Sequence, residues 1–187
     1  MRKLAPYLVS VFAVTVLLSG CDWFRTEKQV EFWFGDVELE AQEKVSKSLM
    51  SISYSPVKAY WMKELDEEVP SYIKGLRIDS ICGELTNLDS INAADFNLYV
   101  SEDSLDWQTL DTSPQASKIS VVNLEPGEQI TVNGGNYKDY FFNLDSLVDE
   151  LKDGHVWAYA VGESSGSYLH ILVYNYTIYI TVTVGLF

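Results

Sequence analysis

The stretch that decides the fold lies at the end of the chain, from Tyr168 to Phe187: YLHILVYNYTIYITVTVGLF. From Leu172 onward its residues alternate in type. One predicted face carries Leu172, Tyr174, Tyr176, Ile178, Ile180, Val182, Val184 and Leu186, and the other carries Asn175, Thr177, Tyr179, Thr181 and Thr183. A strict period of two over this length predicts a β-strand with one buried and one solvated face. The apolar face needs a second layer of structure to cover it.

A second strand is predicted just before this one, over His155–Val161. The Gly- and Ser-rich segment GESSGS, residues 162–167, lies between the two and predicts a hairpin loop. In such a hairpin His155 and His170, the two histidines of the chain, would face each other in similar register. A zinc site needs three or four ligands, so we interpret them as paired strand residues.

Earlier segments repeat this pattern of short strands separated by polar turns. Leu76 and Ile78 alternate, but the apolar positions then shift to Ile81 and Leu85, which predicts a β-bulge near Ser80. A turn is expected at residues 134–136. Further strands are predicted over Val30–Phe34 with Val37–Ala41, and over Leu49–Tyr54, Phe96–Val100, Ile119–Val122 and Gln129–Val132.

Two segments have helical character. Asn143–Lys152 predicts one short helix, since Leu144, Leu147, Val148 and Leu151 share a face, Asn143 or Asp145 could cap its start, and Gly154 follows its end. In Trp61–Gly75 the polar cluster Lys63–Glu68 predicts a short helix or turn. The predicted fold class is all-β: an antiparallel β-sandwich, roughly immunoglobulin-like, with one or two short helices.

The start of the chain has the features of an export signal. Two basic residues, Arg2 and Lys3, precede fifteen uncharged residues from Leu4 to Leu18. A membrane-spanning helix usually needs about 20 apolar residues, so this segment is predicted to target the chain and not to span. The expected organisation is a signal peptide over residues 1–20, a lipidated tether over 21–28 and a single β-sandwich domain over 29–187.

The residues Leu18-Ser19-Gly20-Cys21 resemble the lipobox of bacterial lipoproteins. This resemblance implies that diacylglycerol alkylates the Cys21 thiol, that signal peptidase II cleaves before it, and that the new N-terminus is acylated. Two or three acyl chains on one cysteine anchor a protein firmly. The alternative is an ordinary signal peptide cleaved elsewhere, with Cys21 left free.

Asp22, directly after the cysteine, is the predicted sorting residue. In enteric bacteria the resemblance implies retention by such an Asp at the periplasmic face of the inner membrane; the outer membrane and the cell surface are the alternatives. Residues 73–80, residues 95–100 and the Thr- and Val-rich last strand are also similar to small bacterial lipoproteins with an uncharacterised β-sandwich. That similarity implies a fold and no catalytic residues.

Charge limits the partners of the mature chain. Removal of residues 1–20 takes away two basic and no acidic residues, which leaves 11 basic against 27 acidic side chains and a net charge of −16. Such a surface opposes binding to nucleic acid and to anionic lipid headgroups. Membrane association must therefore come from the acyl chains. Cys82, the second cysteine, has no disulfide partner once Cys21 is a thioether, and we interpret it as a small buried apolar residue. The alternative is a reactive thiol.

Three stretches contain residue types that could carry chemistry. Residues 162–166 match G-x-S-x-G around Ser164. A nucleophile elbow requires a helix directly after the serine, and then an acidic residue and a histidine later in the chain, in that order. The sequence that follows Ser164 is instead patterned as a β-strand. The acidic stretches 101–106 and 87–90 could donate oxygens to Ca²⁺, yet neither has EF-hand spacing. We therefore expect no enzyme activity, no metal site and no cofactor.

Aromatic residues suggest where binding could occur. Three of the tryptophans, Trp33, Trp61 and Trp157, are expected in the core. Trp107, which lies in an acidic loop, and Tyr179, on the polar face of the last strand, are the candidates for a ligand-facing role. The predicted function is a membrane-anchored cell-envelope lipoprotein with a non-enzymatic structural or protein-binding role. The alternative is a carbohydrate- or peptide-binding module presented on the membrane surface.

Overall fold

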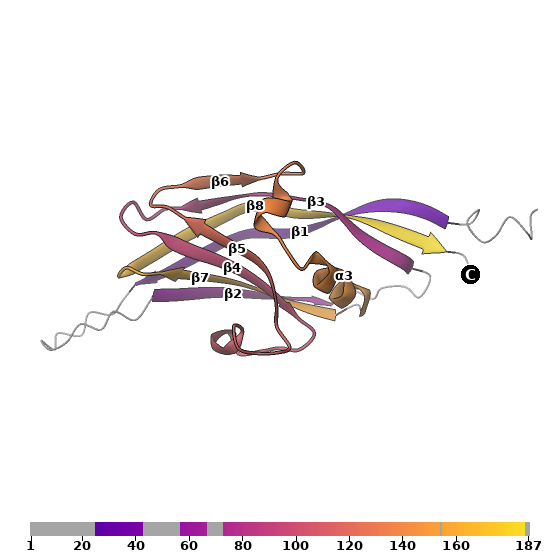
Figure 1. Ribbon diagram of the computed structural model, residues 1–187, viewed down its shortest axis with the longest axis horizontal. Helices are drawn as coiled ribbons and strands as arrows, with labels where there is room; N and C mark the ends of the chain where they lie inside the picture. The colour runs from indigo at the N-terminus through magenta and orange to yellow at the C-terminus, as the bar shows by residue number, and fades with distance from the viewer. Residues whose placement is uncertain (1–24, 43–56, 67–72, 154, 186–187) are drawn as a thin grey trace, which may run out of the picture.

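The protein is an antiparallel β-sandwich. The computed structural model describes residues 25–42, 57–66, 73–153 and 155–185. The strands form two four-stranded sheets in the orders β1-β8-β3-β6 and β2-β7-β4-β5 (Figure 1). Their bounds are β1 Arg25–Gln42, β2 Val57–Asp66, β3 Ile73–Asn87, β4 Ala94–Ser101, β5 Ser117–Leu124, β6 Gln129–Val132, β7 His155–Ser164 and β8 Tyr168–Gly185, and the helices are η2 Trp107–Thr109, α2 Tyr137–Tyr140 and α3 Leu144–Asp153. The predicted all-β sandwich with short helices is confirmed.

The strands alternate between the two sheets along the chain, and among those described only β4 and β5 are both consecutive and paired. The predicted hairpin around Gly162–Ser167 is therefore wrong. β7 pairs with β2 and β4 in one sheet, whereas β8 pairs with β1 and β3 in the other. A local pattern of strand, turn and strand does not say whether the second strand pairs with the first or crosses to the facing sheet.

The last strand is as regular as predicted only in its second half. From Tyr176 to Val182 the expected faces are confirmed, Val184 is half-buried, and Leu186 lies outside the described residues. Leu172 is half-buried and Tyr174 is exposed, so their predicted burial is wrong. The cause is an irregularity: the pairing with β1 shifts on both sides of Gly35, and Asn175 has a left-handed φ of 53°. The buried residues of β8 are Leu169, Ile171 and Val173 before the irregularity, and Tyr176, Ile178, Ile180 and Val182 after it.

Two other local predictions have clear outcomes. The predicted bulge near Ser80 is confirmed, because the pairing of β3 with β8 shifts between Ile78 and Ser80. The predicted helix or turn over Lys63–Glu68 is wrong for residues 63–66, which continue β2 and pair with β7. The neighbouring residues 67–72 and the predicted strand Leu49–Tyr54 lie outside the described residues. β1 begins at Arg25, so four residues of the expected tether belong to the sheet.

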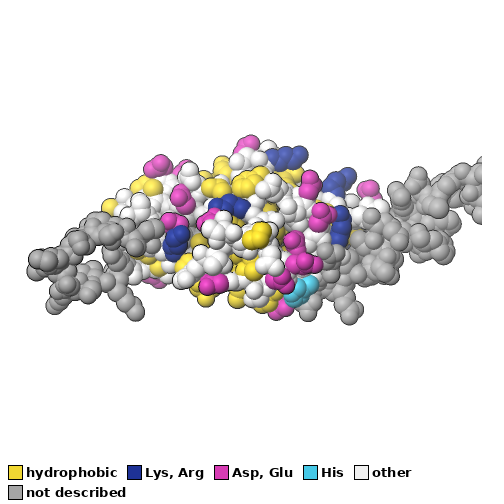
Figure 2. All heavy atoms as spheres, turned by 60° about the horizontal axis from the view of Figure 1, so that its bottom comes forward, with side chains coloured by type: hydrophobic (Ala, Val, Ile, Leu, Met, Phe, Trp, Pro, Cys, Tyr) yellow, Lys and Arg dark blue, Asp and Glu magenta, His cyan; other side chains and the backbone are white. Residues whose placement is uncertain are grey.

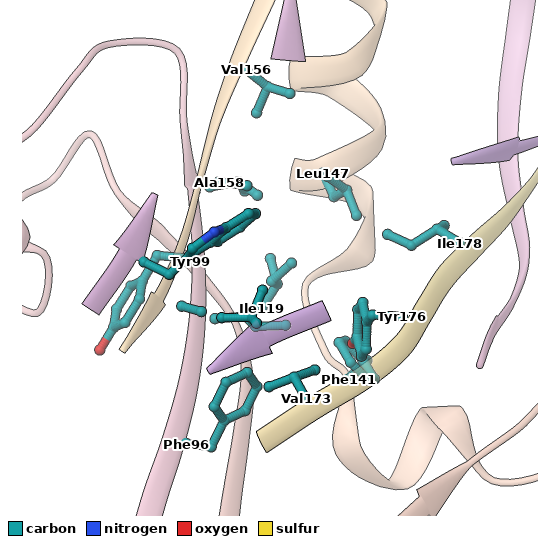
Figure 3. A pocket seen from close by; sticks show the side chains of 15 residues that line it. Phe96, Tyr99, Ile119, Phe141, Leu147, Val156, Ala158, Val173, Tyr176 and Ile178 are labelled. Atoms are coloured by element: carbon teal, nitrogen blue, oxygen red, sulfur yellow. The ribbon is translucent and has the colours of Figure 1, made fainter. Parts of the chain in front are cut away.

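The main core lies between the sheets and is closed on one side by α3. The helix predicted over Asn143–Lys152 is confirmed as Leu144–Asp153, with Leu147 buried and Leu144 and Leu151 packed against the core. Figure 3 shows Leu147 pointing toward the same space as Ile178 and Tyr176 from β8. That space has a volume of only about 40 Å³ and apolar walls, which is room for roughly one or two waters and offers them few polar partners.

None of the helices in the described part of the chain has the length and the apolar run that crossing a bilayer requires.

Candidate ligand-binding site

The chain between β4 and β5, residues 102–116, folds back over the outer face of the sheet β2-β7-β4-β5. Tyr99, Tyr159 and Val161 point from this sheet to its outer side and pack with Leu110 of the loop. We call these four residues the outer cluster. The half-buried side chains packed against it are Leu105, Trp107, Ala116 and Trp157. The sheet thus buries apolar surface on both sides, and the second core is small and built by one loop.

Two tyrosine hydroxyls fix the position of the loop. The Tyr159 hydroxyl accepts a hydrogen bond from the backbone N–H of Leu105 at 2.7 Å and donates to the carbonyl oxygen of Asp103 at 3.4 Å. The Tyr99 hydroxyl donates to Oδ1 of Asp111 at 2.6 Å. In Figure 3 the Tyr99 hydroxyl points away from the main core, toward this outer side. The loop is therefore tied to the sheet near its start and again at Asp111.

Lys118 completes a charged pair at the base of the loop. Its Nζ lies 2.6 Å from Oδ1 of Asp111 and 4.9 Å from the centre of the Tyr99 ring. Hydrogen bonds from Lys118 and Tyr99 hold the pKa of Asp111 below its usual value. Burial lowers the pKa of Lys118, but its hydrogen bonds to Asp111 and Tyr99 outweigh this and raise it. Burial, followed by the bond to Asp111, raises the pKa of Tyr99 to about 12. Near neutral pH the lysine and the aspartate are both charged.

A hollow of about 410 Å³ lies beside the outer cluster. Trp107, one of its lining residues, is stacked on Tyr60: the two rings are 4.7 Å apart and inclined by 11°. Tyr60 is 48% exposed and Trp107 is half-buried. The side of the molecule that holds the loop shows apolar side chains scattered among acidic and basic ones (Figure 2). The hollow is lined by Lys58, Tyr99, Trp107, Gln108, Asp111 and Val161.

Of the two aromatics predicted to face a ligand, Trp107 lies in this site and Tyr179 does not. Tyr179 is half-buried in β8, in the other sheet, so the structure does not bring the two together. Sequence reasoning missed Tyr60, Lys58 and Asp111. The period of two along residues 57–62 was a usable signal, because it places Tyr60 on the same strand face as charged Lys58.

Ser164 has a structural environment. It is 1% exposed, its hydroxyl donates to the carbonyl oxygen of Ala93 at 3.3 Å, and it accepts from the N–H of Gly166 at 3.1 Å. It ends β7, and the next element is β8. The helix that a nucleophile elbow needs after the serine is replaced by a strand.

The histidines do not face each other, because they belong to different sheets. His155 in β7 lies with its Nε2 3.7 Å from Glu64. His170 in β8 is hydrogen-bonded through Nε2 to Glu38 at 2.8 Å and through Nδ1 to the Tyr168 hydroxyl at 3.1 Å. The predicted pairing of the two residues is wrong for the same reason as the hairpin.

The acidic loops use their carboxylates internally. Asp89 accepts hydrogen bonds from the N–H of Ile91 at 2.8 Å and from the Asn92 amide at 2.6 Å. Asp103 accepts from Gln115 at 2.9 Å. Within the described ranges no three His, Cys, Asp or Glu side chains are grouped as metal ligands would be.

The remaining predicted residues are the two cysteines and Asp22. Cys82 lies in β3 and is half-buried, so the predicted full burial of its side chain is wrong. Its position alternates with buried Ile81 and Gly83, so it lies on the outer side of its sheet. Cys21 and Asp22 lie outside the described residues.

Compared with known proteins, the sequence matches no family model and none of the curated proteins.

Proposed function

We propose that this chain is a bacterial cell-envelope lipoprotein, held to a membrane by acyl chains on Cys21, whose sandwich domain has a non-enzymatic, protein-binding role. The motif Leu18–Cys21, at the end of an export signal with a basic start and an uncharged run, carries the anchoring part. β1 begins at Arg25, and the four residues from Cys21 to Phe24 can reach at most about 14 Å even when fully extended. The domain therefore sits close to the membrane surface, and Asp22 directs it to the periplasmic face of the inner membrane.

Such an anchor orients the sandwich. Arg25 pairs with Gly185 and Ile73 pairs with Val184, so the ends of three strands lie together where β1 begins, four residues after Cys21 in the sequence (Figure 1). Asn87 pairs with Ile171, near the opposite end of the sheet. The loop 102–116 and the outer face of β2 then lie on the flank of the domain, where a neighbouring envelope protein can reach them.

The outer face of β2 is the surface that supports protein binding. Tyr60 and Met62 are 48% and 41% exposed, and charged Lys58 and Glu64 flank them on the same face. An apolar centre with a polar rim is the usual anatomy of a protein interface. The stacked Trp107 extends the apolar centre beyond the strand.

Fatty-acid labelling tests the anchor. Cells expressing the full chain are grown with a labelled palmitate, and the protein is isolated. We expect label on the wild type and none on Cys21→Ser; label that persists on the variant contradicts lipidation. Fractionation of the inner and outer membranes tests whether Asp22 retains the protein at the inner membrane. If the Asp22→Ser variant is distributed between the two membranes as the wild type is, this role of Asp22 is contradicted.

Site-specific crosslinking tests the binding role. A photoreactive amino acid at Met62 in the full chain should give one discrete adduct with an envelope protein. Tyr174 is the matched control, since it is similarly exposed at 46% but belongs to the other sheet. Equal adducts from both positions, or none from Met62, contradict a partner on this face.

A second candidate function is a carbohydrate- or peptide-binding module. The hollow beside Trp107 favours it, since its volume falls in the range of about 300–1,000 Å³ that small-molecule sites occupy and its lining mixes aromatic with polar side chains.

A further inference from the structure

The floor of the hollow is the face of a sheet. Lys58, Val161 and Tyr99 come from β2, β7 and β4, which are neighbours paired to each other. β7 and β4 are paired on both sides, and β2, the edge strand, keeps its unpaired groups in the plane of the sheet and not on its face. The floor therefore offers side chains to a ligand and few free main-chain groups. A peptide bound as an added strand is recognised through main-chain hydrogen bonds. The floor therefore disfavours a peptide of this kind.

The charges around the hollow are paired. The Nζ of Lys58 lies 2.7 Å from Oε2 of Glu163, and the Nζ of Lys118 lies 2.6 Å from Oδ1 of Asp111. Each cation thus already has an anion within contact distance. An ionic ligand would have to compete with these pairs, and an anionic one would also meet the acidic surface of the whole chain. The hollow is matched to a ligand without net charge.

The aromatic wall and the polar groups have complementary uses. Stacking on Tyr60 fixes the plane of Trp107, which lines the hollow. The Gln108 amide and the Asp111 carboxylate, both exposed, stand on the same loop within the lining. A pyranose ring has an apolar C–H face that packs on an aromatic ring, and hydroxyls at its edge that bond to amides and carboxylates.

We propose that this hollow binds a neutral saccharide, with one sugar ring packed on Trp107 and its hydroxyls bonded to Gln108 and Asp111. Tyr60 is a positioning residue that holds the indole in place from behind. The hydroxyls of Tyr99 and Tyr159 hold the loop before the ligand arrives, so binding requires little ordering of the chain. This inference deepens the second candidate function above and does not depend on the lipid anchor.

Binding measurements on the mature full-length protein in detergent micelles test the proposal. The probes are neutral oligosaccharides of glucose, galactose, mannose and N-acetylglucosamine, titrated by calorimetry. We expect at least one of them to bind and Trp107→Ala to weaken it roughly tenfold or more. Gln108→Ala should weaken it about fivefold. Tyr174→Ala, which removes an exposed aromatic from the other sheet, should leave it unchanged.

Several outcomes would overturn this assignment. The first is the absence of binding to any of these sugars, and the second is binding that both Trp107→Ala and Gln108→Ala leave unchanged. Binding of a peptide, lost in Trp107→Ala while no sugar binds, would give the hollow to a peptide instead. Gln108→Ala keeps the test valid if Trp107→Ala fails to fold, because the Gln108 side chain is exposed. Palmitate labelling reports separately on the anchor, so the two proposals fail independently.

Discussion

The two faces of the sheet β2-β7-β4-β5 are built in different ways. On the inner face, Phe96 and Ala160 join a mainly apolar core that α3 closes. On the outer face, Tyr99 and Tyr159 meet a loop whose position depends on their hydroxyls. Apolar packing is non-directional, whereas hydrogen bonds select one orientation. The inner face therefore supplies most of the stability, and the outer face holds aromatic and polar groups in a fixed, accessible arrangement suited to binding.

Phe96→Ala breaks the inner face and should have the largest effect. Phe96 is 1% exposed in the main core, and removal of a buried phenylalanine side chain costs about 3–5 kcal/mol of unfolding free energy. Phe142 is the matched control: it is 42% exposed, so Phe142→Ala should cost less than about 1 kcal/mol. Urea denaturation of both variants measures the difference. Equal losses would mean that the core is not where the structure puts it.

Tyr159→Phe breaks the outer face while keeping its apolar packing. The backbone N–H of Leu105 loses its acceptor, and a part-buried donor left without a partner costs about 1–3 kcal/mol. Hydrogen exchange should speed up at Leu105 and neighbouring loop amides, with little change in the inner strands. Tyr168→Phe is the control, since that hydroxyl is bonded on the outer face of the other sheet. Exchange that rises equally across the molecule would contradict a separately held loop.

The inner face was largely predictable from the sequence and the outer face was not. Alternation identified most of the described strands, and the periodicity of residues 143–152 identified α3, because both depend on neighbours within a few positions. The prediction of a hairpin failed because whether β8 pairs with β7 or crosses to the facing sheet depends on strands that are distant in the sequence. The regular alternation predicted around Asn175 failed because the pairing with β1 shifts beside Gly35, which is distant in the sequence.

The site was found only in part for a similar reason. Trp107 stood out as an aromatic residue in an acidic loop. Its stacking partner Tyr60 is 47 positions away in the chain, and the two meet only because the loop folds back over β2. Asp111 looked like one more acidic residue of the loop, since its role depends on the hydroxyl of Tyr99 and on Lys118. Such contacts have no local signature.

Acid should loosen the outer face before the inner one. The folded-state pKa of Asp111 lies below its usual value of 3.8, because Lys118 and Tyr99 favour the carboxylate. Its contribution to stability is thus fully present above about pH 3.8 and is lost as the pH falls through the lowered pKa. The NMR signals of the Trp107 indole should shift in this pH range. In the Asp111→Asn variant the same signals should already be shifted at neutral pH. Asp139→Asn, on α2, is the control and should behave as wild type.

The smallest expected effect on stability is the most informative about the hollow. Glu163→Gln removes the partner of Lys58, and since a pair at the surface is worth about 0–1 kcal/mol, thermal unfolding should hardly change. The hollow, however, gains an unpaired positive charge. If the paired charges are what makes it select neutral sugars, this variant should bind a uronic-acid or sulfated oligosaccharide several-fold better than the wild type does. The gain should shrink as salt screens the charge. An unchanged preference for neutral sugars would mean that the aromatic and amide contacts alone decide the selectivity, and that the ion pair between β2 and β7 only joins the two strands.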